Sequence, residues 1–510
     1  MKKARIKFLL FLIFVCGFAL RIYKLGQHNL WYDEFFTLVT SNNLSLERLC
    51  HQIQSPLYFV FLRQWMNWFG SSELALRLPS TLFNLLCIPI IYRIGKLLFD
   101  RKAGLVSAFM LAVSPFHIWY SQEARGYTLA TPLALATVYL FTLALKKNRM
   151  YLWIGFAVFS ILAVYASYFS FFIIFFTGLF VLLKNRRQLL KRWIVSLCFI
   201  LLAFSPWLPV LFRQAAQIKD GFWTPKPSLG SLLFTFENFN VGYSATPSIY
   251  LLSTIIFSAL FILGISRWKR EKDSLILLMM AFFIPVISVF FISQWMPVYL
   301  DRQLMMFSPF YYIIIAAGLG KIKSRPVNLI IYGLISVSIF SCLYNYHSYR
   351  MPVGLFHHIG VHPKRPVKPA ADYISIGFRR GDIIAFSEES SISLLYYLPK
   401  KQRNYFYFII ESKLEHYWYS VKWRYGTGML QSGLRPRVVV LDKEESSIPG
   451  ARNIGQYNFK RIWLISSSWP KDGELEAHAA AVREWMKANY ELIEGIEFEG
   501  IFIDLYKRKF

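Results

Sequence analysis

Residues 79–120 read PSTLFNLLCIPIIYRIGKLLFDRKAGLVSAFMLAVSPFHIWY, which is two apolar runs joined by a short basic segment. Each run, at 79–98 and at 103–120, has about the 20 residues that a helix needs to cross the hydrocarbon core of a bilayer. The basic residues at 93–102 are typical of a short loop on the cytoplasmic side. This stretch therefore predicts a pair of membrane-spanning helices.

Similar apolar runs recur on both sides of this pair, in a chain of 510 residues of which 55% are hydrophobic. Such a composition is too apolar for an ordinary soluble protein. We predict eleven spans, at 6–24, 79–98, 103–120, 129–145, 151–166, 168–183, 193–212, 248–266, 274–293, 304–319 and 327–346. The basic start of the chain would also fit a cleavable signal, but no small-x-small site closes the first run, so a retained signal anchor is expected.

The positive charge is concentrated in the membrane part. Residues 1–349 carry 33 Lys and Arg against 11 Asp and Glu, which accounts for most of the net charge of +28. If the short segment 56–70 does not cross the bilayer, one side receives all the basic segments, at 1–7, 93–102, 146–149, 184–192, 267–272 and 321–325. The positive-inside rule then explains the charge without a nucleic acid partner, and 56–70 is predicted as an interfacial helix.

An α/β domain is expected after the last span, where the composition changes to mixed charge. Short β-rich runs occur in DYISIGFRRGDIIAF (372–386), RPRVVVLDKEE (435–445) and KRIWLISSS (460–468). A helical segment near 474–489 and the late strands YELIEGIEFE and IFIDLYKRK follow. We therefore predict a transmembrane domain at 1–349, with outer loops at 25–78 and 213–247, and an extracytoplasmic α/β domain at 350–510.

An acidic pair, Asp33 and Glu34, lies in the first outer loop among four aromatic residues, Trp31, Tyr32, Phe35 and Phe36. A carboxylate that aromatic neighbours and the bilayer surface partly desolvate is a stronger base, which suits proton removal from a reacting group. Two solvated loop acids, or the first turn of a helix, would have the same sequence. The pattern makes the pair a candidate for catalysis and leaves a structural role open.

Two further outer segments place charge beside apolar helices. SPFHIWYSQEARGYTL (114–129) contains Gln122, Glu123 and Arg125, and MPVYLDRQLMMFSPF (296–310) contains Asp301 and Arg302. Charge at the membrane is costly and is therefore often functional, and an arginine can hold a phosphate through paired hydrogen bonds. The structural alternatives are a Glu123–Arg125 contact that caps helix ends and an Arg302 that snorkels to the interface.

Other chemistry has weaker support. His357, His358 and His362 follow the last span, but their spacing fits no strong zinc pattern. The five cysteines are scattered and predict no disulfide framework. The motifs of soluble nucleotide chemistry and of a serine nucleophile are missing. The long outer loop 213–247 has the length of a functional lid.

These outer-loop motifs resemble those of the GT-C membrane glycosyltransferases, in the group of the protein O-mannosyltransferases and of the aminoarabinose or galacturonate transferases of lipid A. The resemblance rests on the acidic pair, SPLYFVFLRQW (55–65), ALRLPS (75–80) with the segment 114–129, and YLDRQLMMFSPFYYIIIAAGL (299–319). The sequence similarity is strong over residues 28–145, moderate from there to about residue 346, and weak in the C-terminal part. It implies a polytopic α-helical membrane protein with the GT-C fold.

Such a resemblance implies transfer of a sugar from a polyprenyl phosphate, whose phosphate is the leaving group. Asp33 matches the family's catalytic acidic position and would take the proton of the acceptor while the sugar inverts, with Glu34 orienting the acceptor or tuning Asp33. Arg125 and Arg302 would hold the donor phosphate. The remaining motif residues would contact donor or acceptor: Gln122, Glu123, Tyr58 and Tyr127.

Two departures from the family pattern bear on the donor. Gln303 replaces the Tyr of the late Arg-Tyr motif, and Gln54-Ser55-Pro56 replaces a Lys-Pro-Pro or His-Pro-Pro of some relatives. The cation that those relatives direct at the phosphate is missing, so the two arginines would have to serve instead. Family members differ in whether a divalent metal takes part, and the sequence leaves metal use open.

A transporter or lipid flippase, and a non-catalytic scaffold of the same fold, are the alternative functions. Transporters usually place polar groups near the bilayer midplane in repeated halves, whereas here the acids cluster at one face and no repeat is visible. We therefore expect a transferase of the bacterial cytoplasmic membrane, with its N-terminus inside and with a lipid, glycan or protein acceptor.

Overall fold

The computed structural model describes residues 3–348 except 186 and 221–223, and beyond them 350–352, 361, 367–387, 392–399, 401–404, 406–410, 437–440, 452–453, 459–467, 473–498 and 500–509. The chain forms two compact units. Unit 1 comprises residues 1–25, 52–70 and 74–363, and unit 2 comprises residues 26–51, 71–73 and 364–510. The segment 26–51, part of the predicted outer loop 25–78, thus folds with the C-terminal domain.

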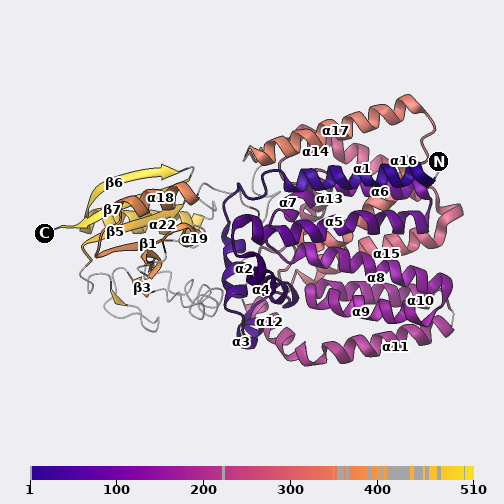
Figure 1. The fold of residues 1–510 in the computed structure, drawn as a ribbon, viewed down its shortest axis with the longest axis horizontal. Helices are drawn as coiled ribbons and strands as arrows, with labels where there is room; N and C mark the ends of the chain where they lie inside the picture. The colour runs from indigo at the N-terminus through magenta and orange to yellow at the C-terminus, as the bar shows by residue number, and fades with distance from the viewer. Residues whose placement is uncertain are drawn as a thin grey trace. The chain divides into compact units, whose positions relative to one another are not determined.

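Unit 1 is a bundle of α-helices (Figure 1). Its long helices are α1 (Lys3–Ile22), α5 (Glu73–Leu98), α6 (Arg101–Val113), α8 (Tyr127–Lys147), α9 (Met150–Ala166), α10 (Phe171–Leu183), α11 (Arg187–Phe204), α14 (Pro247–Ile265), α15 (Trp268–Ile292), α16 (Ser308–Leu319) and α17 (Arg325–His347). By length and composition, six described helical segments could cross a bilayer, and α6 with α7 (Pro115–Ser121) makes a seventh. The predicted helical membrane fold is confirmed, and the count of eleven spans stays a prediction.

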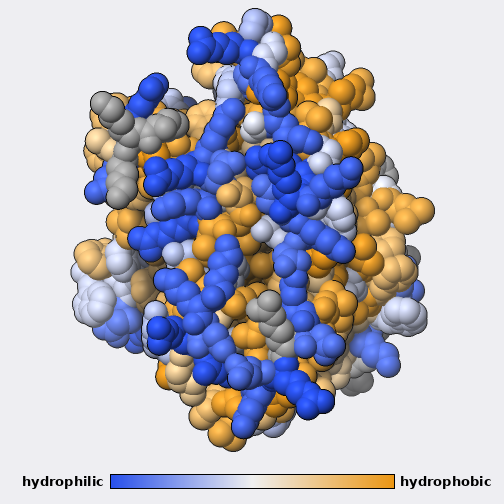
Figure 2. All heavy atoms as spheres, turned by 90° about the vertical axis from the view of Figure 1, so that its right-hand side faces the viewer, coloured by the Kyte–Doolittle hydropathy of each residue, from blue (hydrophilic) through white to orange (hydrophobic). Residues whose placement is uncertain are grey.

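The basic loops meet at one end of unit 1. Lys146 Nζ donates to the Leu97 carbonyl at 2.7 Å, and Lys184 forms an ion pair with Asp273. Figure 2 shows that hydrophilic side chains gather across the end at which the N-terminus lies, with hydrophobic side chains at its flanks. This arrangement agrees with the single basic side that the charge pattern predicts.

The predicted span 103–120 is not one straight helix. α6 ends at Val113, and α7 continues from Pro115 after a bend of 55°. Pro115 has no N–H, so the Leu111 carbonyl, four residues earlier, lacks its intrahelical donor. Arg21 of α1 supplies one: its fully buried guanidinium donates to the Leu111 carbonyl at 3.0 Å and to the Ala112 carbonyl at 2.6 Å. Proline therefore bends the span, and a buried arginine satisfies the carbonyls at the bend.

Both predicted outer loops contain helices. The first holds α2 (Tyr32–Asn42), α3 (Leu46–His51) and α4 (Leu57–Phe69), and the second holds α13 (Leu229–Val241) after the end of α12 (Leu208–Asp220). Helix α4 occupies the predicted interfacial segment 56–70. Its 13 residues extend about 20 Å, less than the ~30 Å of a hydrocarbon core. The interfacial position of α4 stays a prediction.

Unit 2 centres on a sheet whose described strands lie in the order β4-β3-β2-β1-β5-β7-β6. They are β1 (Asp382–Phe386), β2 (Phe406–Ile410), β3 (Arg437–Val440), β4 (Arg452–Asn453), β5 (Arg461–Ser467), β6 (Tyr490–Phe498) and β7 (Ile501–Arg508). β1 to β5 are parallel, and β7 pairs antiparallel with β5 and β6. The predicted runs at 435–445, 460–468 and 490–509 contain strands, whereas β2 and β4 lie outside every predicted run.

One predicted β-rich run is half helix. Helix α18 (Val367–Gly377) occupies the first part of the run 372–386, and only its end forms β1. Val367, Ala370, Ala371 and Ile374 are buried, which is the spacing of one helix face. The short β-rich run predicted within 372–386 is therefore β1 alone, because residues 372–377 continue a helical face that starts five residues upstream.

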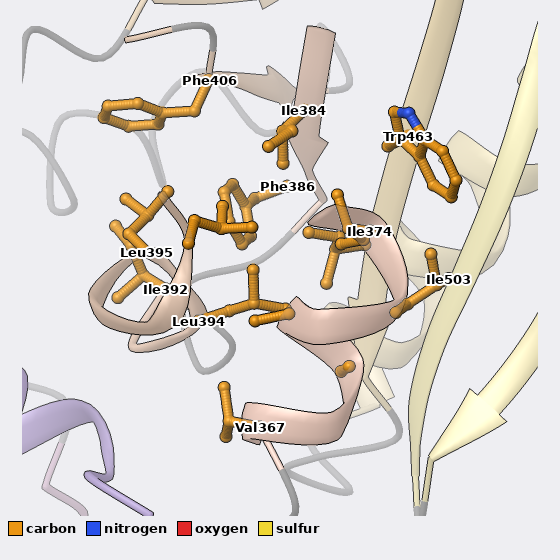
Figure 3. Packing of buried hydrophobic residues seen from close by; sticks show 14 of the residues in the cluster. Val367, Ile374, Ile384, Phe386, Ile392, Leu394, Leu395, Phe406, Trp463 and Ile503 are labelled. Atoms are coloured by element: carbon orange, nitrogen blue, oxygen red, sulfur yellow. The ribbon is translucent and has the colours of Figure 1, made fainter. Parts of the chain in front are cut away.

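Helices cover both faces of the sheet. Ile384 and Phe386 of β1 pack against α18 and α19 (Leu394–Tyr397), as Figure 3 shows. The alternate residues Ile383 and Ala385 belong to a second core with α22 (Gly473–Asn489). Successive side chains of a strand point to opposite faces, so one short apolar strand serves both cores.

Candidate functional site

A pocket in unit 1 collects residues from distant parts of the chain. Tyr58 of α4, Tyr127 at the start of α8, Tyr168 after α9 and Arg302 of the 3-10 helix η3 (Asp301–Phe307) all line it. Its volume is about 70 Å³, which is room for a few water molecules or one small polar group. Three residues that the sequence singled out separately, Tyr58, Tyr127 and Arg302, therefore share one pocket.

Arg125 contacts the wall of this pocket. The side chain is buried, and its guanidinium donates to the Tyr127 hydroxyl at 3.3 Å and lies 5.5 Å from the centre of the Tyr127 ring. In the amide orientation that satisfies both partners, the Gln54 side-chain oxygen accepts hydrogen bonds from Arg125. Gln54, the position at which the sequence departs from the family pattern, is thus a partner of Arg125 and lines the same pocket.

Tyr58 is fixed from the opposite side. Its buried hydroxyl forms a hydrogen bond with the Ser80 hydroxyl of α5 at 2.9 Å. Gly126 allows a close approach here, because a Cβ at this position would lie 3.3 Å from the Tyr58 Cβ. The motifs at 55–65, 75–80 and 114–129 therefore meet through Tyr58, Ser80 and Gly126.

Asp301 fixes the backbone at Arg302. Its Oδ1 accepts the Arg302 backbone N–H and the Tyr243 hydroxyl, both at 2.7 Å, and its Oδ2 accepts the Asn238 amide at 2.7 Å. Tyr243 in turn shares a hydrogen bond of 2.6 Å with Tyr120 of α7. Burial raises the pKa of Asp301, and these hydrogen bonds together with the Arg302 charge act in the opposite direction.

Three members of this network were not predicted from the sequence. Tyr120 lies in the segment 114–129 but was not singled out, and Asn238 and Tyr243 lie 63 and 58 residues from Asp301. The only signal was that Asn238 and Tyr243 belong to the long outer segment 213–247. Through this network the segment is tied to the start of η3.

Gln122 and Glu123 take part in internal hydrogen bonds. The Gln122 amide donates to two backbone carbonyls at the end of α1, at 2.9 and 2.8 Å, and its oxygen accepts the Tyr346 hydroxyl at 2.8 Å. Glu123 Oε1 accepts the Trp119 indole N–H at 2.8 Å. The described lining of the pocket includes neither residue. Their predicted contacts with donor or acceptor stay predictions, and Gln122 has an evident structural function.

The acidic pair belongs to unit 2. Asp33 and Glu34 lie in the first turn of α2, and Glu34 is fully buried whereas Asp33 is half-buried. Glu34 Oε2 accepts the backbone N–H of Trp31 at 3.4 Å, as an acid in this position does when it caps a helix. Negative charge in the first turn is also favourable beside the positive end of the helix dipole. Glu34 therefore has a structural role, and the catalytic roles of both acids stay predictions.

Helix α2 shares its core with the C-terminal domain. Phe35 and Val39 are buried in the same cluster as Val367 and Leu395. The chain that leads into α2 is held as well, because the Leu30 backbone N–H donates to the Tyr397 hydroxyl at 2.8 Å. The C-terminal domain thus supports the helix that carries the acidic pair.

A metal site does not emerge from the described residues. Nowhere among them do three His, Cys, Asp or Glu side chains come together as ligands. His357, His358 and His362 lie outside the described part of the chain.

Comparisons with known proteins agree with the geometry. Residues 53–211 match the family model described as dolichyl-phosphate-mannose-protein mannosyltransferase. A sequence search among curated proteins finds no match. The fold is similar to that of ArnT from Cupriavidus metallidurans in the apo state, with a TM-score of 0.62 at 11% identity over 97% of each chain. The predicted family resemblance is therefore confirmed for the part of the chain that holds most of the motifs.

Two similar structures contain polyprenyl lipids. One is ArnT from Cupriavidus metallidurans bound to undecaprenyl phosphate, with a TM-score of 0.61 at 10% identity over 99% of this chain and 98% of that one. The other is the archaeal oligosaccharyltransferase AglB from Archaeoglobus fulgidus in complex with an inhibitory peptide and a dolichol-phosphate. Its TM-score is 0.54 at 13% identity, over 100% of this chain and 74% of that one. The predicted GT-C fold is confirmed.

Proposed function

We propose that this chain, which has the GT-C fold of membrane glycosyltransferases, moves a sugar from a polyprenyl phosphate donor to an acceptor. The observation that carries the proposal is the pocket of unit 1, which Arg302 and three tyrosines line beside Arg125. Two buried guanidinium groups favour an anionic ligand. Structures of the same fold are bound to undecaprenyl phosphate or dolichol-phosphate. These ligands support a lipid phosphate as the anion that the two arginines would bind.

The reaction is an inverting displacement at the anomeric carbon. The acceptor oxygen or nitrogen attacks this carbon from the face opposite the phosphate, the bond to the phosphate oxygen breaks, and that oxygen keeps the electron pair. Arg125 and Arg302 stabilise the negative charge that grows on the phosphate. Phosphate is a good leaving group, so no strong general acid is needed. Tyr58 and Tyr127 orient the donor at the pocket.

Asp33 accepts the proton of the acceptor. The support for this role is the sequence, in which Asp33 occupies the family's catalytic acidic position, while Glu34 has the structural role of a cap. Asp33 is only half-buried at the start of α2, so its carboxylate is within reach of an incoming acceptor. A positioned general base typically contributes a factor of about 100 to 10,000 to the rate.

The reaction takes place at the outer face of the bacterial cytoplasmic membrane. The proposal is supported by the hydrophilic end of unit 1 at which the N-terminus lies, because basic loops are typical of the cytoplasmic side. Residues 120–127 connect α7 to α8, and residues 301–303 precede α16. Both segments lie at the ends of these helices that are away from the basic loops. The acceptor, a lipid, a glycan or a protein, approaches from outside.

The test is sugar transfer by the purified full-length protein from extracted polyprenyl phosphate sugars, with the product identified by mass. We expect wild type to form product, Asp33→Asn to lose about 100-fold or more of the rate, and Arg302→Ala to lose at least as much. Glu47→Gln, an exposed acid of unit 2, is the matched control and should keep the wild-type rate. No product from wild type across several lipid donors would refute the proposed activity. Product from Asp33→Asn at the wild-type rate would refute the role of Asp33 alone.

A further inference from the structure

Unit 1 has a second cavity, a groove of about 630 Å³ between α9 and α11. Ile154 and Val158 of α9 and Val195 and Phe199 of α11 line its sides. The pocket that holds Arg302 shares none of these lining residues, so the groove is separate from the proposed site of transfer.

The groove has a basic end. Where α9 and α11 begin, it is lined by Gln188, Lys191 and Arg192, and none of the described lining residues is acidic. Arg192 is held in place, because its guanidinium donates to the Asn148 side-chain oxygen at 2.9 Å and also to the Asn148 backbone carbonyl. Lys191 is exposed beside it. One cation held by hydrogen bonds and one exposed cation therefore lie at the same end of an apolar groove.

The groove opens toward lipid. α11 begins the candidate membrane span 187–219, of which only 22% of the most apolar window is buried within the protein. Ile154 is 55% exposed and Phe199 is 61% exposed. Large apolar side chains that are exposed at membrane depth contact acyl chains rather than water. The ligand that fits this groove is therefore amphiphilic, with its apolar part along the helices.

The length of the groove and the charge at its end indicate which kind of lipid it binds. From Met150 to Ile161, both of which line the groove, α9 rises about 16 Å, which is half of a hydrocarbon core of about 30 Å. The groove thus spans one leaflet. Basic pockets between membrane helices bind anionic lipid headgroups. We propose that the groove binds an anionic phospholipid, with its phosphate at Lys191 and Arg192 and one acyl chain between α9 and α11.

Native mass spectrometry of the delipidated full-length protein tests this proposal with phosphatidylglycerol and phosphatidylcholine of identical acyl chains. We expect wild type to prefer phosphatidylglycerol by about 25-fold, about fivefold for each of the two cations near an anionic lipid. Lys191→Gln should reduce this preference about fivefold, and Val195→Trp, which fills the groove, should remove binding of both lipids. The matched controls are Lys323→Gln and Val337→Trp, both exposed and outside the groove; they should behave as wild type.

Equal binding of both lipids by wild type would overturn the proposal, as would an equal loss in the control variants. Displacement of phosphatidylglycerol by inorganic phosphate would also overturn it, because it would show a phosphate site without a lipid site. If Val195→Trp does not fold, Val158→Trp fills the groove from α9 and gives the same test. Because none of the substituted residues lines the pocket of Arg302, the differences between variants are independent of the transfer reaction.

Discussion

Asp301 controls Arg302 through the backbone, because one carboxylate holds the Arg302 N–H, the Tyr243 hydroxyl and the Asn238 amide. Asp301→Asn replaces one carboxylate oxygen with an NH2 group, which donates and therefore cannot accept the hydrogen bond that this oxygen receives. Hydrogen bonds to a charged group contribute about 1.5–3 kcal/mol each. We expect Asp301→Asn to lower kcat/KM for the donor by about 10- to 100-fold, with a larger change in the donor KM than in the acceptor KM. Steady-state kinetics with each substrate varied in turn measures both.

Asp273→Asn is the control for this prediction. Its carboxylate pairs with Lys184 at the basic end of unit 1, where the side chain is 66% exposed, and exposed pairs contribute little. Unchanged donor kinetics in a folded Asp301→Asn protein would show that Arg302 does not depend on Asp301.

At the scale of single residues, the sequence predicts the residues that line the pocket better than the residues that hold them in place through hydrogen bonds. Tyr58, Tyr127 and Arg302 stand in motifs, and they do share one pocket. Tyr243 and Arg21 stand in no motif. Their importance comes from hydrogen bonds to residues tens of positions away, and no local pattern indicates a distant partner.

At the scale of elements, Arg21 determines whether α6 and α7 can bend. Arg21→Met keeps most of the side-chain volume and removes the donors to the Leu111 and Ala112 carbonyls. Each buried carbonyl left without a partner costs about 1–3 kcal/mol, and hydrocarbon offers no water to replace the donor. We expect Arg21→Met to lower the Tm by several degrees in a thermal unfolding assay in detergent.

Arg5→Met on the same helix is the comparison, because Arg5 is exposed and should leave the Tm within about one degree. The same Tm for wild type and Arg21→Met would mean that other donors or water satisfy the bend.

Hydropathy predicted where the helices lie but not how they end or bend. Every predicted span contains helix, because apolar length determines it. The bend at Pro115 needs the partner arginine to be stable, and this arginine belongs to another helix. In unit 2, the helix at the start of the run 372–386 could not be recognised from the run alone. Its buried face begins at Val367, outside the run.

At the scale of the whole molecule, the division into units follows packing rather than the order of the chain. The sequence suggested one boundary near residue 349, where the apolar runs stop. In the structure, residues 26–51 fold with residues 364–510. This association could not be predicted, because Phe35 and Val39 look like ordinary aromatic and aliphatic residues of a membrane-proximal loop, and only the tertiary core reveals their partners.

The proposed role of Asp33 predicts that sugar transfer depends on the core that α2 shares with the C-terminal domain, and a cavity mutation tests this. Phe35→Ala removes a buried ring from the cluster with Val367 and Leu395, at a cost of about 3–5 kcal/mol. We expect α2 to become sensitive to protease and the sugar-transfer rate to fall although Asp33 is unchanged, with partial recovery in Phe35→Leu. Phe36→Ala, which removes the same ring from the next position, half-buried and outside this cluster, should show neither effect. Wild-type transfer by a protease-sensitive Phe35→Ala protein would mean that the acidic pair works without the support of the C-terminal domain.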